Sequence, residues 1–99
     1  MTHYLIIDDE PIAHRIIEKY CDNLPHLKKS GNCFNAFEAM QFLNQEHVDL
    51  LFLDINMPKL SGFDFLKTLT NPPKIIVTTA YKEFAIEGYE LNISDYLLK

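Results

Sequence analysis

The sequence predicts an α/β domain in which helices cover both faces of a parallel sheet. The run Leu50–Asp54 consists of four apolar residues and then a carboxylate, and Tyr4–Ile7 likewise leads into three acidic residues. Such short, uninterrupted apolar runs are typical of strands buried on both faces, as parallel strands are. Helical patterns separate the runs. Strand and helix therefore alternate, which implies right-handed crossover connections.

Length and composition indicate one domain of 99 residues, with 47% hydrophobic and 23% charged residues. The net charge of −5 argues against direct nucleic-acid binding by this domain. No apolar stretch is long enough for a membrane span and the start does not resemble a signal peptide, so we expect a cytoplasmic location. Cys21 and Cys33 form no metal motif and are expected to be semi-buried small hydrophobes. Histidines without metal-ligand spacing are expected to be exposed or half-buried: His3, His14, His26 and His47.

The first strand is expected at His3–Asp8, and Pro11 fits the first turn of the helix that follows. Apolar residues recur in this helix at intervals of four, while charged residues take the other side. This pattern predicts an amphipathic helix that buries its apolar stripe against the sheet. The expected buried stripe contains Ile12, Ile16 and Tyr20, widened by Ile17 and Leu24.

The segment Lys28–Phe34 begins with two lysines, which suits an edge strand because charges there discourage pairing with another molecule. Asn35 is a plausible N-cap of the next helix, and Glu38 stands three positions on, as in a capping box. The apolar face of this helix is expected to consist of Ala36, Ala39, Met40 and Leu43.

The rest of the chain continues the alternation. After the central strand we expect a loop at 59–62 and a helix at Phe63–Thr70, with Phe63, Leu66 and Leu69 inward and Phe65 as a further candidate. Lys74–Thr79 is β-branched nearly throughout and is expected to be a buried strand. A short helix at 82–91 and a last strand at Asp95–Lys99 complete the pattern.

Carboxylates stand at the carboxyl ends of two predicted strands, where open α/β sheets bind their ligands. Asp8, Asp9 and Asp54 would repel one another unless a divalent cation lay between them. Mg²⁺ suits such a site, since it takes a few carboxylate oxygens, and the backbone carbonyl of Asn56 is available as a further ligand. With the metal present, Asp54 can act as a nucleophile toward a phosphoryl group.

Phosphoryl transfer also needs donors for the phosphoryl oxygens. Thr79 ends one predicted strand with a hydroxyl, and Lys99 ends the last strand with an ammonium group. Both strands end at the same edge of the parallel sheet as Asp54. These two residues are therefore candidates for contacts to the phosphoryl group.

The motifs of this chain, taken together, resemble those of a known family. Together, Asp8-Asp9, the run Asp54–Pro58, Gly62, Thr79-Ala80 and the ending Tyr96–Lys99 resemble the receiver domain of two-component response regulators, in the same order and spacing along the whole chain. Within that family, Thr79–Tyr81 with Phe84-Ala85 and Asp95–Lys99 is similar to the receivers of LytTR-type regulators, also called the LytR/AlgR family, in which a DNA-binding module follows the receiver.

The resemblance implies a flavodoxin-like (CheY-like) sheet with the order 2-1-3-4-5. It also implies that Asp54 accepts a phosphoryl group from a sensor histidine kinase, with Mg²⁺ held by Asp8, Asp9, Asp54 and the Asn56 carbonyl. Thr79 and Lys99 would contact the phosphoryl group. Tyr96 would be an aromatic switch that turns inward when Thr79 moves toward the phosphate.

Family members carry one more helix after the position of Lys99, and the chain ends there. We therefore expect residues 1–99 to be a receiver domain without its C-terminal helix, with the effector domain outside this chain and DNA bound only through that domain. Apolar surface on Ile6, Leu51 or Leu97 should then be uncovered, which predicts either instability or association of two copies into a homodimer through that face.

Two other functions use the same residues. A Mg²⁺-dependent phosphohydrolase with an aspartyl nucleophile commonly has a second acid two residues further on, where this chain has Asn56, which cannot transfer a proton. A binding module of the same fold that is never phosphorylated is disfavoured by the intact set of site residues. The predicted activity is therefore that of a regulatory phosphoacceptor, which catalyses its own phosphorylation and dephosphorylation, and not that of an enzyme with a separate substrate.

Overall fold

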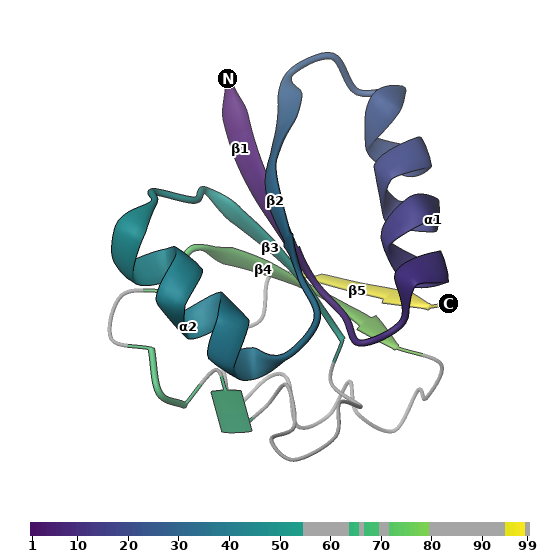
Figure 1. The fold of residues 1–99 in the computed structure, drawn as a ribbon. Coiled ribbons are helices and arrows are strands. Elements are labelled where there is room, and N and C mark those ends of the chain that lie inside the picture. The colour runs from purple at the N-terminus through teal and green to yellow at the C-terminus, as the bar shows by residue number, and fades with distance from the viewer. Residues whose placement is uncertain (55–63, 66, 70–71, 80–94, 99) are drawn as a thin grey trace.

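In the part of the chain that the structure describes, five parallel strands form one sheet with the order β2-β1-β3-β4-β5 (Figure 1). This computed structural model describes residues 1–54, 64–65, 67–69 and 72–78, with the backbone alone for Thr79 and 95–98. The sheet confirms the predicted fold class and strand order. The strands are β1 (Thr2–Ile7), β2 (Leu27–Cys33), β3 (Leu50–Asp54), β4 (Lys74–Thr79) and β5 (Asp95–Leu98), and the helices are α1 (Pro11–Asp22) and α2 (Ala36–Gln45).

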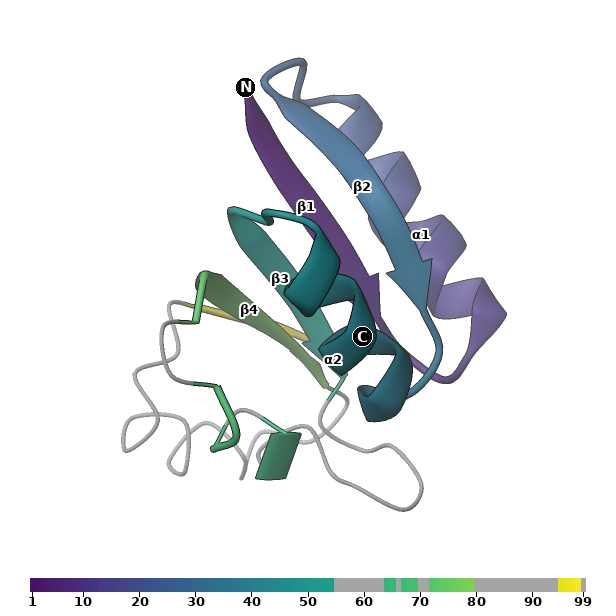
Figure 2. The ribbon, with the colours of Figure 1, turned by 60° about the vertical axis from the view of Figure 1, so that its left-hand side comes forward.

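Helices α1 and α2 lie on opposite faces of the sheet, as the two views in Figures 1 and 2 show. Along each strand, successive side chains point to opposite faces, so each helix meets every second residue. On the α1 face, Ile17 and Cys21 pack with Tyr4, Ile6 and Phe52. On the α2 face, Ala36 and Ala39 pack with alternate residues of the same strands, Leu5, Ile7, Leu51 and Leu53.

The start of α2 follows the sequence prediction closely. The Asn35 side-chain oxygen accepts a hydrogen bond of 2.8 Å from the backbone N–H of Glu38, which satisfies one of the free N–H groups of the first turn. The Glu38 carboxylate accepts in return from the backbone N–H of Phe34, also at 2.8 Å. The predicted apolar face is confirmed too, with Ala36 and Ala39 buried and Met40 and Leu43 packed at the edge of the cluster.

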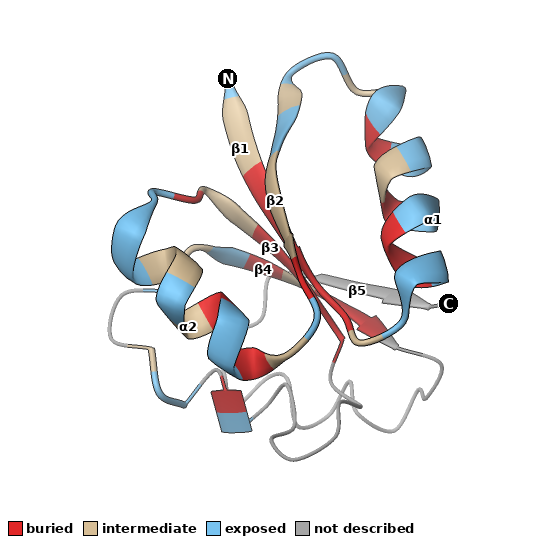
Figure 3. Cartoon of the chain, viewed as in Figure 1, coloured by how far each residue is buried: buried red, intermediate tan, exposed pale blue. Residues whose placement is uncertain are grey.

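The predicted buried stripe of α1 is wrong for Ile12, Ile16 and Tyr20, whereas Ile17 is buried as predicted and Leu24 is half-buried. Ile12, Ile16 and Tyr20 are 67%, 64% and 52% exposed. Figure 3 shows that α1 is exposed along its outer side and buried toward the sheet. The inward stripe is displaced by one residue and consists of Ala13, Ile17 and Cys21, with His14 beside it. Ala13 and Cys21 are small, so this buried side of the helix carries less apolar volume than the exposed side. An outward apolar stripe is therefore left on α1.

β2 is an edge strand, as predicted, because it has a partner on one side only in the strand order. Its register against β1 shifts between Tyr4 and Leu5. Gly31 lies in this region under α2, and a Cβ atom at this position would stand 2.7 Å from Cε2 of Phe42. The close approach of the Phe42 ring to the backbone of β2 thus requires a glycine.

The expectation of uncovered apolar surface is wrong for the residues that the structure describes. Ile6 lies under α1 and Leu51 belongs to the α2 face, and both are fully buried. The side chain of Leu97 lies outside the described residues. So do the predicted loop at 59–62, the helix at 82–91, and Phe63 and Leu66 of the helix predicted at Phe63–Thr70. Within that last segment, Phe65 is fully buried and Leu69 packs against the same cluster, as predicted.

Neither of the two described helices is long and apolar enough to cross a membrane.

Candidate functional site

Two of the predicted carboxylates, Asp8 and Asp54, stand at the carboxyl ends of the neighbouring strands β1 and β3. β1 and β3 pair in parallel up to Ile7 opposite Leu53, so that Asp8 and Asp54 occupy the next position on each strand. Neighbouring strands lie about 4.8 Å apart, which brings the two backbones close together. Both side chains are buried, Asp8 at 0% exposure and Asp54 at 2%. Two carboxyl groups are thus gathered at one edge of the sheet, as the sequence predicted.

Asp9 and Glu10 extend this acidic edge. One carboxylate oxygen from each of Asp8, Asp9 and Glu10 lies within 4.8 Å of the others. The Oδ1 atom of Asp9 is buried and has no hydrogen-bond partner among the described residues. A buried carboxylate oxygen without a donor is strongly disfavoured unless a cation compensates it. The carboxylates present therefore fit a hard divalent cation such as Mg²⁺, which prefers oxygen ligands.

Hydrogen bonds from three directions hold Asp8. Its backbone N–H donates to the carbonyl oxygen of Cys33 at the end of β2, over 3.0 Å. Its side-chain Oδ1 accepts from the backbone N–H of Glu10 at 2.9 Å, and its backbone carbonyl is 2.8 Å from Nε2 of His14. The turn that carries the acidic residues is therefore fixed to β2, to itself and to α1.

The predicted hydroxyl donor, Thr79, ends β4, where its backbone pairs with Leu98 of β5. Its neighbour Thr78 is the residue in register with Asp54. The Thr78 hydroxyl is buried and lacks a hydrogen-bond partner in the part of the chain that the structure describes. Sequence reasoning missed Thr78, because a threonine inside a β-branched strand is an ordinary strand residue.

Several predicted site residues are not tested by the structure. Asn56 and Lys99 lie outside the described residues, as do the side chains of Thr79 and Tyr96. The backbone of Tyr96 is in β5, in register with Val77 of β4. β5 therefore lies beside β4, which is the arrangement that the predicted switch requires.

His14 is 3% exposed, so its predicted exposure is wrong. Besides the contact to Asp8, its Nδ1 is 2.7 Å from Nδ2 of Asn32, and its ring stacks on Phe34 with 4.3 Å between ring centres. Asn32 also donates to Glu18 at 3.0 Å, and Glu18 pairs with Lys29. The partners that bury His14 come from β2 and the residue after it, far away in sequence, so no local pattern around His14 indicates them.

The two thiols take no part in the acidic edge. Cys21 and Cys33 are both free and 2% exposed, which confirms their predicted role as small apolar residues. Burial raises the pKa of the Cys33 thiol to about 11 and also raises that of Cys21. Both side chains are therefore protonated at neutral pH and are poor nucleophiles.

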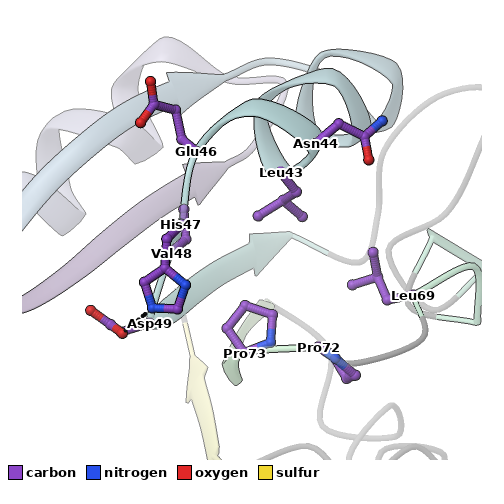
Figure 4. Close-up of a pocket in the computed structure, with 9 residues that line it drawn as sticks. All are labelled: Leu43, Asn44, Glu46, His47, Val48, Asp49, Leu69, Pro72 and Pro73. Carbon is purple, nitrogen blue, oxygen red and sulfur yellow. Dashed lines mark hydrogen bonds and ion pairs between the residues drawn. The ribbon is translucent and has the colours of Figure 1, made fainter.

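A pocket of about 470 Å³ lies at the opposite edge of the sheet, where β3 and β4 begin (Figure 4). Two of its polar residues are in contact: His47 is 2.8 Å from Asp49, whose other oxygen accepts from the backbone N–H of His3. These hydrogen bonds hold the pKa of Asp49 below its ordinary value. The pocket thus has a structural explanation and is remote from the acidic edge.

A comparison with protein families identifies the class. Residues 4–99 match the response regulator receiver domain, so the chain belongs to this family of phospho-accepting signalling domains in two-component systems. The resemblance inferred from the sequence is therefore confirmed.

Individual relatives agree with this class. The chain is 37% identical to the transcriptional regulatory protein BtsR of Escherichia coli and 35% identical to the sensory transduction protein LytT of Enterococcus faecalis. These matches cover 100% and 98% of this chain, and they confirm the LytTR-type resemblance. The chain spans 42% of the length of BtsR and 41% of that of LytT.

A solved structure supports the fold. The response regulator TrrA of Thermotoga maritima, in complex with Mg²⁺ and BeF, superposes with a TM-score of 0.85 at 25% identity, over 100% of this chain and 87% of that one. That structure holds a magnesium ion, as the acidic edge of this chain was predicted to do.

Proposed function

We propose that Asp54 accepts a phosphoryl group from a sensor histidine kinase. This proposal is supported by two buried carboxylates, Asp8 and Asp54, at adjacent strand ends. It is also supported by the buried oxygen of Asp9, which has no hydrogen-bond partner among the described residues. The carboxylate of Asp54 attacks phosphorus, the bond to the kinase histidine breaks, and the histidine keeps the electron pair. The product is an acyl phosphate on Asp54.

The ligands proposed for Mg²⁺ are Asp8, Asp9, Asp54 and the backbone carbonyl of Asn56. The bound ion would offset negative charge as the phosphoryl group is transferred. The hydroxyl of Thr79 and the ammonium group of Lys99 are proposed to contact the phosphoryl oxygens. Binding of Thr79 would withdraw it from its resting position and let Tyr96 turn inward, so that the state of Asp54 is passed to β5.

The proposed partners follow from the class and its relatives. The kinase is proposed to dock on the outward stripe of α1, formed by Ile12, Ile16 and Tyr20. This stripe starts close to Asp9 in the chain, so that a partner lying along it reaches the acidic edge. The output is proposed to be a LytTR DNA-binding domain that follows in the whole protein, which would act in the cytoplasm.

The test is phosphorylation by a small donor, acetyl phosphate, in the presence of Mg²⁺. We expect the mass of the chain to rise by one phosphoryl group and the label to be lost in hydroxylamine, as an acyl phosphate should be. The matched control is Asp54→Asn, which keeps the shape of the side chain and removes the nucleophile. Label that persists on Asp54→Asn would contradict the proposal. Repeated turnover of p-nitrophenyl phosphate would instead support a phosphohydrolase.

A further inference from the structure

His14 is a buried polar residue on α1 whose two ring nitrogens both have partners. Nε2 lies 2.8 Å from the backbone carbonyl oxygen of Asp8, and Nδ1 lies 2.7 Å from Nδ2 of Asn32. The ring is 3% exposed and stacks on Phe34 with an angle of 26° between the planes. Its position is therefore fixed at both edges and on one face.

These contacts define which nitrogen carries the hydrogen. A carbonyl oxygen can only accept, so Nε2–H donates to Asp8. The Asn32 amide is oriented by the carboxylate of Glu18, which accepts from the same Nδ2 atom at 3.0 Å. Nδ2 therefore also donates to His14, and Nδ1 accepts. The hydrogen-bonded chain Glu18, Asn32, His14 sets the tautomer that donates to Asp8.

The charge on Glu18 supports this chain. Hydrogen bonds from Lys29 and then from Asn32 hold the pKa of Glu18 below its ordinary value, so it remains a carboxylate at neutral pH. An ionised acceptor orients the Asn32 amide more strongly than a neutral one would. The polar residues of the edge strand β2 thus act, through His14, on the end of β1.

The position of the Asp8 carbonyl determines the direction in which the Asp9 side chain points. This carbonyl belongs to the peptide group that joins the two residues, and a peptide group is planar. A donor that fixes the carbonyl fixes the plane, and with it the direction in which Asp9 leaves the turn. Asp9 carries the buried oxygen that lacks a partner among the described residues.

We propose that His14 is a positioning residue of the divalent-cation site: its Nε2–H holds the Asp8–Asp9 peptide so that the Asp9 carboxylate is aimed for metal binding before the ion arrives. This inference rests on the proposed function, because it requires the acidic edge to bind Mg²⁺. Groups that orient metal ligands commonly change affinity by about 10- to 100-fold when they are removed.

The experiment compares Mg²⁺ affinities of variants of the 99-residue chain by NMR titration of backbone amides. We expect His14→Leu, which has no donor, to raise the Kd for Mg²⁺ by about tenfold. His14→Gln keeps an N–H donor on a flexible side chain and should recover much of the affinity. Ile17→Val is the matched control, since it loosens the same buried side of α1 without touching Asp8, and its Kd should equal that of the unchanged chain.

The outcomes separate the two proposals. If the unchanged chain does not bind Mg²⁺, the proposed function fails. If the unchanged chain binds Mg²⁺ and folded His14→Leu binds it equally well, the role of His14 is refuted. Nitrogen-15 shifts of the His14 ring in the unchanged chain give a test that needs no variant to fold. The neutral ring should carry its hydrogen on Nε2, and a hydrogen on Nδ1 would overturn the inference.

Discussion

The orientation of α1 can be tested with two neighbouring isoleucines, one exposed and the other buried against the sheet. Ile17 is 3% exposed and packs between Tyr4, Ile6 and Phe52, whereas Ile16 is 64% exposed. Replacing either residue by alanine removes the same atoms from the same helix. The difference between the two variants therefore reports burial alone.

The expected loss for Ile17→Ala is large because its surroundings cannot close the gap. Tyr4 and Phe52 meet edge to face at 5.6 Å on neighbouring central strands, which are held on both sides by pairing. A cavity should remain, so we expect the free energy of unfolding to fall by about 3 kcal/mol, within the range of buried Ile→Ala substitutions. For a domain of this size, that corresponds to a fall in Tm of about 12–24 °C.

Ile16→Ala should change the free energy of unfolding by less than about 0.5 kcal/mol, since alanine also has a higher helix propensity than isoleucine. Urea unfolding followed by far-ultraviolet circular dichroism measures both variants. A loss for Ile16→Ala as large as that for Ile17→Ala would refute the orientation of α1. If the kinase docks on this stripe, Ile16→Ala should be phosphorylated by acetyl phosphate at the rate of the unchanged chain. Its phosphorylation by the kinase should be slower.

Two further predictions concern β2. Gly31→Ala should lower the free energy of unfolding by about 1–3 kcal/mol, because the new Cβ would stand 2.7 Å from the Phe42 ring. This loss should be smaller in a Phe42→Leu background. A double-mutant cycle measured by urea unfolding tests this coupling. The pKa of the Cys33 thiol is raised to about 11 by burial, so the unfolded chain loses this proton first as the pH rises above about 9. The free energy of unfolding should therefore fall as the pH rises from about 9 to about 11. Cys33→Ala should reduce the slope of the free energy of unfolding against pH in this range. An unchanged slope would contradict the raised pKa of Cys33.

The sheet and its acidic edge could be predicted from sequence because their signals are local. A strand buried on both faces must be an uninterrupted apolar run, and β3 and β4 begin and end close to where the runs at Leu50 and Lys74 predict. Parallel strands place their carboxyl ends together, so that the order of strands and acidic residues along the chain is enough to assign Asp8 and Asp54 to one edge.

The face of α1 could not be predicted in the same way, because two stripes compete one residue apart. The stripe of Ile12 and Ile16 carries the larger apolar side chains, and the stripe of Ala13 and Ile17 carries smaller ones. The amount of apolar side chain favours burial of the first stripe, but the structure buries the second. A stripe of large apolar residues left exposed is better explained by a partner than by the core.

The burial of His14 was missed for a related reason. A histidine in a helix has no local sign of a partner, and Asn32 follows 18 residues later on another element. Polar residues at an edge strand are readily interpreted as protection against aggregation. In this chain the same residues also support the end of β1: the Cys33 carbonyl binds the amide of Asp8, and Asn32 orients the ring that binds its carbonyl.

The two halves of the acidic edge are therefore supported by different parts of the fold. Asp8 and Asp9 depend on the turn after β1 and on hydrogen bonds from β2 and α1, whereas Asp54 is set by β3 and its pairing with β4. Loss of the polar contacts at Asn32 should weaken the proposed metal site while the apolar core around Asp54 stays packed. The proposed nucleophile Asp54 lies on a central strand, whereas the proposed metal ligands Asp8 and Asp9 lie on a hydrogen-bonded turn. We therefore expect changes around this turn to alter metal affinity without changing the residue proposed to be phosphorylated.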